Sequence, residues 1–114
     1  MIDAVGDTIA SRRGEVLAVM ADETGKTIAE GDPEVSEAVD FARYNARESL
    51  GLAALTASGS VTSAPLGTVV VTPPWNFPFS IPVGGVLAAL AAGNAVILKP
   101  ALQSVRTAWL VARC

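Results

Sequence analysis

The sequence predicts an α/β fold in which N-terminal helices are followed by a single βαβ unit. Two apolar runs, Thr68–Thr72 and Ala95–Leu98, have the composition of strands. Between them lie residues 73–94, a length ample for the helical crossover that joins two parallel strands. The first run is β-branched without alternation, which predicts a strand covered on both faces. Polar residues follow both runs, at the strand ends where open α/β sheets bind ligands.

Composition and charge are those of one small globular unit. Of the 114 residues, 51% are hydrophobic, which argues against disorder. The net charge is −3, and all 11 acidic residues lie between Asp3 and Glu48. We therefore expect a solvated helical front over residues 1–50 and a buried back over residues 65–114. No basic stripe suggests nucleic-acid binding.

Cysteine use and hydropathy bear on location. The single cysteine, Cys114, cannot form an internal disulfide, and the N-terminus lacks the pattern of a signal peptide. Residues 77–98 are uncharged and mostly apolar, but prolines and glycines interrupt them. The uninterrupted part is too short to span a membrane. We expect a cytoplasmic protein without a membrane-spanning segment.

The front of the chain predicts helices. Two sets of apolar residues recur at helical spacing: Ile2, Val5, Ile9 and Val16, Leu17, Met20. They indicate two short helices, or one bent helix, ending near Gly25. A further helix is predicted to start at Asp32-Pro33-Glu34 and to run towards Leu50. Asp32 can cap it, Pro33 suits its first position, and Glu34 favours its positive end.

The rest of the chain is less uniform. Residues 51–64 form either a connector or short strands, with a turn at residues 58–60 (SGS). Within the crossover, residues 86–92 are the uninterrupted helical part, and Gly93 is placed to end it. A final helix is predicted from Ser104 to Arg113, with Ser104 as its cap.

The sequence does not contain a complete set of catalytic groups. It has no histidine, and no carboxylate follows Glu48. Its serines and threonines have no visible base partner, which nucleophilic catalysis requires. A metal site lacks ligands, and the glycine-rich phosphate loops are absent.

Two polar residues remain as candidates, Asn76 and Lys99. Asn76 lies in a proline-stiffened loop, where its amide could donate to a developing oxyanion or simply bond loop backbone. Lys99 ends an apolar strand, where it could donate to ribose or phosphate oxygens or reach solvent. Trp75 and Phe77 are pocket walls or core residues.

At these residues the sequence resembles the NAD(P)-dependent aldehyde dehydrogenase superfamily. An ordered series carries the resemblance: residues 74–78 (PWNFP), Gly84, residues 88–94 (AALAAGN) and residues 99–101 (KPA). Residues 23–27 (ETGKT) and 32–41 (DPEVSEAVDF) resemble the glutamate-γ-semialdehyde (pyrroline-5-carboxylate) dehydrogenases. The similarity is greatest to that half of the bifunctional proline-catabolic flavoenzymes called proline utilization A.

The resemblance implies roles for these residues. Asn76 would be the side-chain half of the oxyanion hole, and Phe77 would lie near the aldehyde. The cofactor, NAD or NADP, would be lined by Thr72, Pro73, Pro74, Trp75, Lys99 and Ala101, with Lys99 on the adenosine ribose. The fold implied is one βαβ unit of an incomplete Rossmann-like cofactor domain. The reaction implied is oxidation of glutamate γ-semialdehyde to glutamate in proline catabolism.

Departures from the family pattern bear on activity. Leu102 stands where many members carry a glutamate that binds ribose hydroxyls, which leaves NAD and NADP both open. The family's catalytic cysteine and general-base glutamate lie downstream of the matching segment, and Cys114 is in the wrong context. We therefore expect an N-terminal fragment that is inactive alone, binds no cofactor tightly and forms homo-oligomers. The alternatives are a non-catalytic, self-associating interaction module and an aldehyde dehydrogenase of another substrate class.

Overall fold

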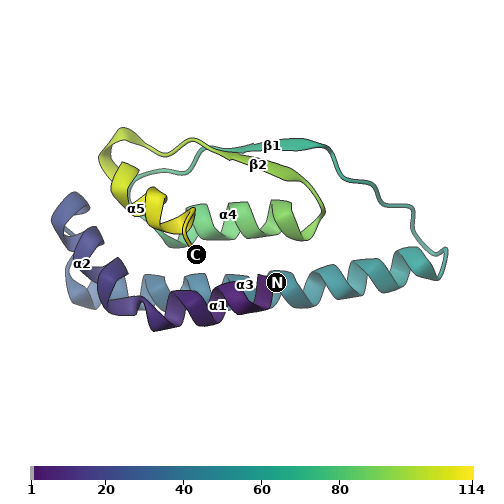
Figure 1. Ribbon diagram of the computed structural model, residues 1–114, viewed down its shortest axis with the longest axis horizontal. Helices are drawn as coiled ribbons and strands as arrows, with labels where there is room; N and C mark the ends of the chain where they lie inside the picture. The colour runs from purple at the N-terminus through teal and green to yellow at the C-terminus, as the bar shows by residue number, and fades with distance from the viewer. Residues whose placement is uncertain (1) are drawn as a thin grey trace.

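The computed structural model describes residues 2–114, which form an α/β structure of three layers. Its elements are α1 (Ile2–Ser11), α2 (Arg13–Thr24), α3 (Ile28–Ala57), β1 (Thr68–Val71), α4 (Ser80–Ala91), β2 (Ala95–Leu98), the 3₁₀ helix η1 (Leu102–Ser104) and α5 (Val105–Val111). Figure 1 shows α4 lying between the two strands on one side and α3 on the other, with α1 alongside α3. This order confirms the predicted helical front followed by one βαβ unit.

The first two helices are separate, which settles one of the open alternatives. The helix is interrupted at Arg12, between the end of α1 and the start of α2. Gly25 ends α2 as predicted: its φ is 71°, and its N–H donates to the carbonyl of Ala21. Glycine adopts this left-handed conformation without the penalty that a Cβ would add.

The predicted start of the third helix was wrong. Helix α3 begins at Ile28, and its cap is Thr27, whose hydroxyl accepts from the Glu30 N–H while the Glu30 carboxylate accepts from the Thr27 N–H. This reciprocal capping box satisfies two donors at the helix start. Pro33 therefore lies inside the helix, and Glu34 is not in its first turn. A proline pattern alone could not reveal that the capping box lies one turn earlier.

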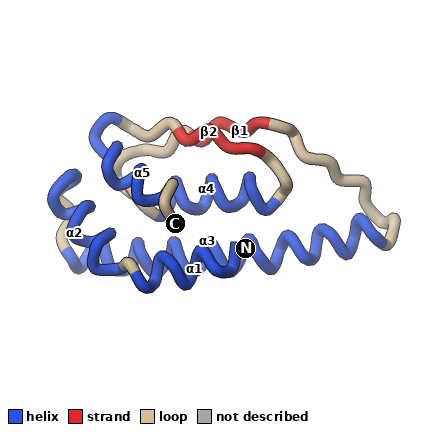
Figure 2. Tube along the Cα trace, viewed as in Figure 1, coloured by secondary structure: helices blue, strands red, loops and turns tan. Residues whose placement is uncertain are grey.

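Helix α3 also extends further than predicted, to Ala57. The first half of the expected connector, residues 51–57, is thus helical and carries no strand. Its alanines and leucines favour helix intrinsically, which lets it continue although the side chains there are exposed. The predicted turn is confirmed by Gly59, with a φ of 73°. The loop that follows rises from the end of α3 to β1, as Figure 2 shows.

The two strands are parallel, with Thr68 paired to Ala95 and Val71 to Leu98. The expectation that the first strand is covered on both faces was wrong for residues 2–114. Side chains along each strand alternate between exposed and half-buried, and Val70 and Ile97 are 58% and 55% exposed. Among these residues the crossover helix covers one face, and nothing described covers the other.

Helix α4 begins at Ser80, six residues before the stretch predicted to be helical. Pro82 lies in its first turn, where a missing N–H costs no intrahelical bond. Gly85 allows the helix to approach the sheet, because a Cβ there would lie 2.9 Å from the Val71 side chain. On the opposite side, a Cβ at Gly84 would lie 3.0 Å from the ring of Phe41 in α3. The helix ends at Gly93 as predicted, with a φ of 82°.

The core lies where α1, α2 and α3 meet α4 and α5. Its buried residues come from both halves of the chain: Ile9, Val16, Met20, Val35, Ala38, Val39, Ala42, Phe79, Val83, Leu87, Leu110 and Val111. Phe79 is fully buried, although no sequence pattern predicted it as a core residue. No helix within residues 2–114 is both long and apolar enough to cross a bilayer.

Candidate functional site

The loop between β1 and α4 carries Asn76 at the surface. Pro73 and Pro78 are buried, whereas Pro74, Trp75, Asn76 and Phe77 are exposed. The side-chain amide of Asn76 forms no hydrogen bond with another residue in the part of the chain that the structure describes. The bonding of loop backbone considered above is therefore not what the structure shows. The amide remains available to donate to a ligand.

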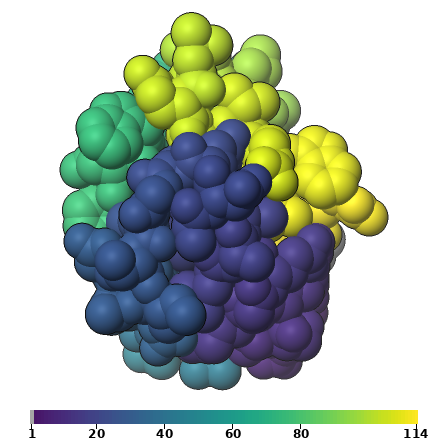
Figure 3. All heavy atoms as spheres, turned by 90° about the vertical axis from the view of Figure 1, so that its left-hand side faces the viewer, coloured from purple at the N-terminus to yellow at the C-terminus, as the bar shows by residue number. Residues whose placement is uncertain are grey.

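Asn76 lies in a polar cleft of about 220 Å³ at one end of the molecule. The lining residues come from two segments that are far apart in the sequence: Thr24, Gly25, Lys26, Glu30, Trp75 and Asn76. Figure 3 shows this end, where α2 and the start of α3 (dark blue) lie beneath the β1–α4 loop (green) on one side. Lys26 and Glu30 were not predicted to be site residues, although Lys26 lies within the ETGKT segment and Glu30 three residues after it.

Beneath the cleft, the carboxylate of Glu34 is fully buried. Its Oε1 accepts hydrogen bonds from the N–H groups of Phe79 and Ser80, at 2.7 and 3.0 Å. Its Oε2 pairs with the Lys26 ammonium. Glu34 was expected to favour the start of its own helix, and the structure corrects this, because the residue caps α4 instead. Burial against another element explains the difference, and no local pattern reveals it.

Lys99 and Thr72 lie side by side where the two strands end. The Lys99 N–H donates to the carbonyl of Val71 at 2.9 Å, which continues the parallel ladder by one bond. The Lys99 side chain is exposed and forms no ion pair with any residue among 2–114. Lys99 and Thr72 do not line the cleft that holds Asn76. The loop that begins at Thr72 joins the two places.

The donors at these strand ends fit a sugar or phosphate ligand. Lys99 offers three N–H donors on an exposed stem, and ribose hydroxyls and phosphates accept from such groups. The start of α4 does not offer the anion site common at helix N-termini, because Glu34 already occupies the N–H groups of Phe79 and Ser80. A dinucleotide could therefore bind Lys99 and the exposed loop here, but it could not bind the N–H groups of residues 79 and 80.

The remaining predicted residues lie around these two places. Trp75 and Phe77 are 52% and 43% exposed, so they are surface walls and not core residues. The Lys26 ammonium lies 4.3 Å from the centre of the Phe77 ring, within range of a cation–π contact. Ala101 is half-buried at the start of η1, two residues after Lys99.

Cys114 is held against the body of the protein. Its thiol donates to the carbonyl of Leu110 at 3.3 Å and lies 3.7 Å from the Arg12 guanidinium. Burial raises the pKa of the Cys114 thiol, and Arg12 offsets this only in part. A raised pKa keeps the thiol protonated at neutral pH, which is unlike an activated nucleophile.

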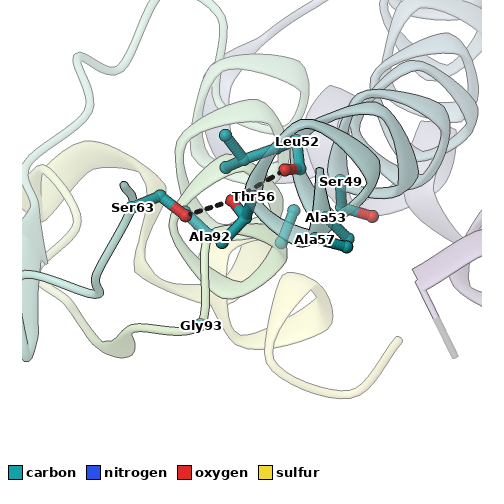
Figure 4. A pocket seen from close by; sticks show the side chains of 9 residues that line it. Ser49, Leu52, Ala53, Thr56, Ala57, Ser63, Ala92 and Gly93 are labelled. Carbon is teal, nitrogen blue, oxygen red and sulfur yellow. Dashed lines mark hydrogen bonds between the residues drawn. The ribbon is translucent and has the colours of Figure 1, made fainter. Parts of the chain in front are cut away.

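A wider groove, of about 460 Å³, lies between the far end of α3 and the C-terminal end of α4. Figure 4 shows that Thr56 and Ser63 point towards each other there, and their hydroxyls are 2.9 Å apart. The remaining lining residues are small or apolar: Ser49, Leu52, Ala53, Ala57, Ala91, Ala92 and Gly93. The groove holds no charged group, and its two facing hydroxyls bond each other.

Comparisons with known proteins show the family to which the chain is similar. The model of the aldehyde dehydrogenase family matches residues 1–114. A 1-pyrroline-5-carboxylate dehydrogenase from Staphylococcus epidermidis is 41% identical over 112 residues, covering 92% of this chain and 22% of that protein. The enzyme of that name from Anoxybacillus flavithermus is 41% identical over 100 residues, covering 82% of this chain and 19% of that protein.

Solved structures of related enzymes superpose on this chain. Proline utilization A from Corynebacterium freiburgense superposes with a TM-score of 0.87 at 46% identity, covering 98% of this chain and 11% of that one. A 1-pyrroline-5-carboxylate dehydrogenase superposes with a TM-score of 0.83 at 32% identity, covering 95% of this chain and 22% of that one. The chain thus spans about a fifth of the length of the curated relatives it matches. It belongs to the aldehyde dehydrogenase family.

Proposed function

We propose that residues 1–114 are part of an NAD(P)-dependent aldehyde dehydrogenase that oxidises L-glutamate γ-semialdehyde to glutamate. The observation that carries the proposal is the exposed Asn76 amide, free of side-chain hydrogen bonds within the described chain and set in a stiff loop beside a pair of parallel strand ends. The names of the relatives support this substrate class, since they are called 1-pyrroline-5-carboxylate dehydrogenases.

In this reaction Asn76 donates a hydrogen bond to the aldehyde oxygen as negative charge develops on it. Such a donor is most effective when the protein holds it in place before the reaction begins. Lys99 would hold the ribose of the dinucleotide, and Thr72, Pro74 and Trp75 would line the cofactor. Phe77 borders the aldehyde. NAD(P), when bound, would supply the acceptor for the hydride that leaves the aldehyde carbon.

The nucleophile and general base of the family are not assigned to any residue of this chain. The raised pKa of Cys114 and its bond to Leu110 argue against that residue. We propose that residues 1–114 do not oxidise aldehydes without the rest of the enzyme. The proposal includes a cytoplasmic location and self-association, the latter supported by the exposed Val70 and Ile97 on the open sheet face.

A chimera tests the proposal. Residues 1–114 replace the matching segment of the Staphylococcus epidermidis relative, which supplies the remainder, and NAD⁺ reduction is followed with 1-pyrroline-5-carboxylate. We expect turnover, and an Asn76→Ala chimera should lose about 10²- to 10³-fold in kcat, the loss typical of one oxyanion donor. Asn45→Ala is the matched control, because that amide bonds the Phe41 carbonyl away from the cleft. A folded chimera whose kcat is unchanged by Asn76→Ala contradicts the proposal.

The interaction-module alternative is tested with residues 1–114 alone. Saturation-transfer NMR with NAD⁺ should give a weak signal that Lys99→Met abolishes, because the lysine is the exposed donor at the strand ends. A folded sample that shows no transfer at millimolar NAD⁺ would instead favour a module that does not bind the dinucleotide.

A further inference from the structure

We propose that Glu34 and Lys26 are a positioning pair that sets the orientation of Asn76. Neither residue needs to touch the aldehyde or the dinucleotide in this role, because both act through the loop that carries Asn76. The inference rests on the proposed function for its kinetic consequence, but its structural part is tested without any turnover.

The first step is the anchoring of the loop by Glu34. The carboxylate is fully buried and accepts from the N–H groups of Phe79 and Ser80, which are the third and fourth residues after Asn76. Hydrogen bonds to a buried charged acceptor are stronger than neutral ones. These two bonds therefore fix the junction between the loop and α4 to helix α3, and not to β1, the strand before the loop.

The second step is the contact of Lys26 with Phe77. The Lys26 ammonium pairs with the other oxygen of Glu34, and its side chain is only 14% exposed. The same ammonium lies 4.3 Å from the centre of the Phe77 ring. One cation thus joins the buried carboxylate to the residue that directly follows Asn76, and it does so from the segment between α2 and α3.

The third step is the absence of another restraint on Asn76. Its amide makes no side-chain hydrogen bond to any residue that the structure describes, so the backbone of residues 75–77 and its own rotamer set its direction. The prolines at 73, 74 and 78 limit φ at their own positions. Pro78 also restricts Phe77, the residue before it. Neither effect sets φ and ψ at Trp75 and Asn76, so Lys26 and Glu34 add the contacts that hold this part of the loop.

Glu34→Gln separates the ion pair from the cap. Glutamine keeps one oxygen that can accept from Phe79 and Ser80, but it then turns its N–H₂ donors towards the Lys26 ammonium, which is also a donor. The cap can persist while the Lys26 contact is lost. Lys26→Met breaks the same pair from the other side and keeps an apolar stem. Both variants should release Phe77, and with it Asn76.

The structural test is NMR of residues 1–114. In Glu34→Gln and Lys26→Met we expect the side-chain amide resonances of Asn76 and the ring resonances of Phe77 to shift or broaden. Glu23→Gln is the matched control, because Glu23 caps α5 and contacts Arg106 and Thr107 instead of the loop. It should leave both sets of signals in place. Unchanged Asn76 signals in both test variants would overturn the proposal.

The kinetic test is a double-mutant cycle in the chimera. Glu34→Gln should lower kcat by up to about 10²-fold, the size of effect expected from a small misplacement of a reacting group. In the Asn76→Ala background the same change should have almost no further effect on kcat, because the group it positions is gone. An equal loss in both backgrounds would overturn the proposal. An Asn76→Ala chimera with unchanged kcat would overturn the proposed function itself, so the two failures are distinguishable.

Discussion

The N-termini of α4 and α5 are capped in the same unusual way, but in different surroundings. Each receives a carboxylate from the helical front of the chain. Glu34, from α3, accepts from the N–H groups of Phe79 and Ser80. Glu23, from α2, accepts from the N–H groups of Arg106 and Thr107, each at 2.7 Å. The Glu34 carboxylate is fully buried, whereas Glu23 is only half-buried.

Two of the 11 acidic residues, all of which precede Ser49, thus act on the back of the chain. The back of the chain has two helices whose starts lack acidic side chains of their own, and the front provides them. At α4 the carboxylate also holds a cation, Lys26. At α5 the neighbouring ion pair of Asp22 and Arg106 is exposed, and pairs of that kind contribute little. We therefore expect the buried Glu34 cap to contribute more to the free energy of unfolding than the half-buried Glu23 cap.

The largest effect is expected from Glu34→Ala. The change leaves two buried N–H donors unpaired and removes the partner of Lys26, and breaking a buried ion pair from one side typically costs about 3–5 kcal/mol. The free energy of unfolding from urea titration of residues 1–114 measures it. A loss below about 1 kcal/mol would mean that burial does not distinguish the two caps.

A smaller effect is expected from Glu23→Ala. The variant loses the cap of α5, including the bond from the Thr107 hydroxyl at 2.7 Å, but water can reach the freed donors. Loss of a cap typically costs about 1–2 kcal/mol. The same urea titration measures it, with hydrogen exchange at Arg106 and Thr107 as the local readout. A loss equal to that of Glu34→Ala would remove the contrast between the two helix starts.

Thr27→Ala removes a cap that a helix receives from a residue next to it in the sequence, and it serves as a comparison with the two glutamate caps. Thr27 caps its own helix through Glu30, three residues away, at the exposed start of α3. We expect a loss of about 1 kcal/mol, the usual value for a threonine cap. Thr8→Ala is the control, because that hydroxyl bonds the Ala4 carbonyl within α1 and caps nothing. Equal losses in the two variants would argue that the capping box adds nothing.

The smallest effect is expected at Glu30, and it depends on pH. Hydrogen bonds from the Thr27 hydroxyl and N–H lower the pKa of the Glu30 carboxyl below its ordinary value of 4.5. A group whose folded pKa is lowered adds stability above the unfolded pKa and loses it as pH falls through the folded pKa. Glu30→Gln should therefore be less stable than the parent at pH 7 and should approach it below the folded pKa. Urea titrations at several pH values measure this, and a constant difference would contradict it.

Much of the fold followed from short-range patterns. Gly25 and Gly93 end helices where predicted, and two apolar runs form the parallel pair. The errors concern context. The Asp32-Pro33-Glu34 pattern looked like a helix start, yet the capping box of Thr27 and Glu30 lies earlier and begins the helix. Residues 51–57 were predicted to be part of a connector or of short strands, but they continue α3, because alanine and leucine favour helix even where the side chains are exposed.

The candidate site shows the same division. The proline-bracketed Asn76 and the strand-end Lys99 were found from the sequence, because turn chemistry and strand ends are properties of neighbouring residues. Their roles as oxyanion and ribose donors remain predictions. Lys26 and Glu34 could not be found in this way. Glu34 had a simpler local explanation, and the two N–H groups that donate to it lie 45 and 46 residues further along the chain.

Residue types and spacing were enough to predict that the helices exist, the βαβ order and the stiff loop, because backbone preference acts over a few residues. They did not give the bounds of α3 and α4. Those patterns did not predict which group each acidic side chain contacts. Whether a glutamate faces water or caps a distant helix depends on how α3 packs against α4, and that packing depends on contacts between many side chains at once. Burial makes the loss of the Glu34 carboxylate strongly destabilising, because an unpaired charge or N–H group away from water is costly.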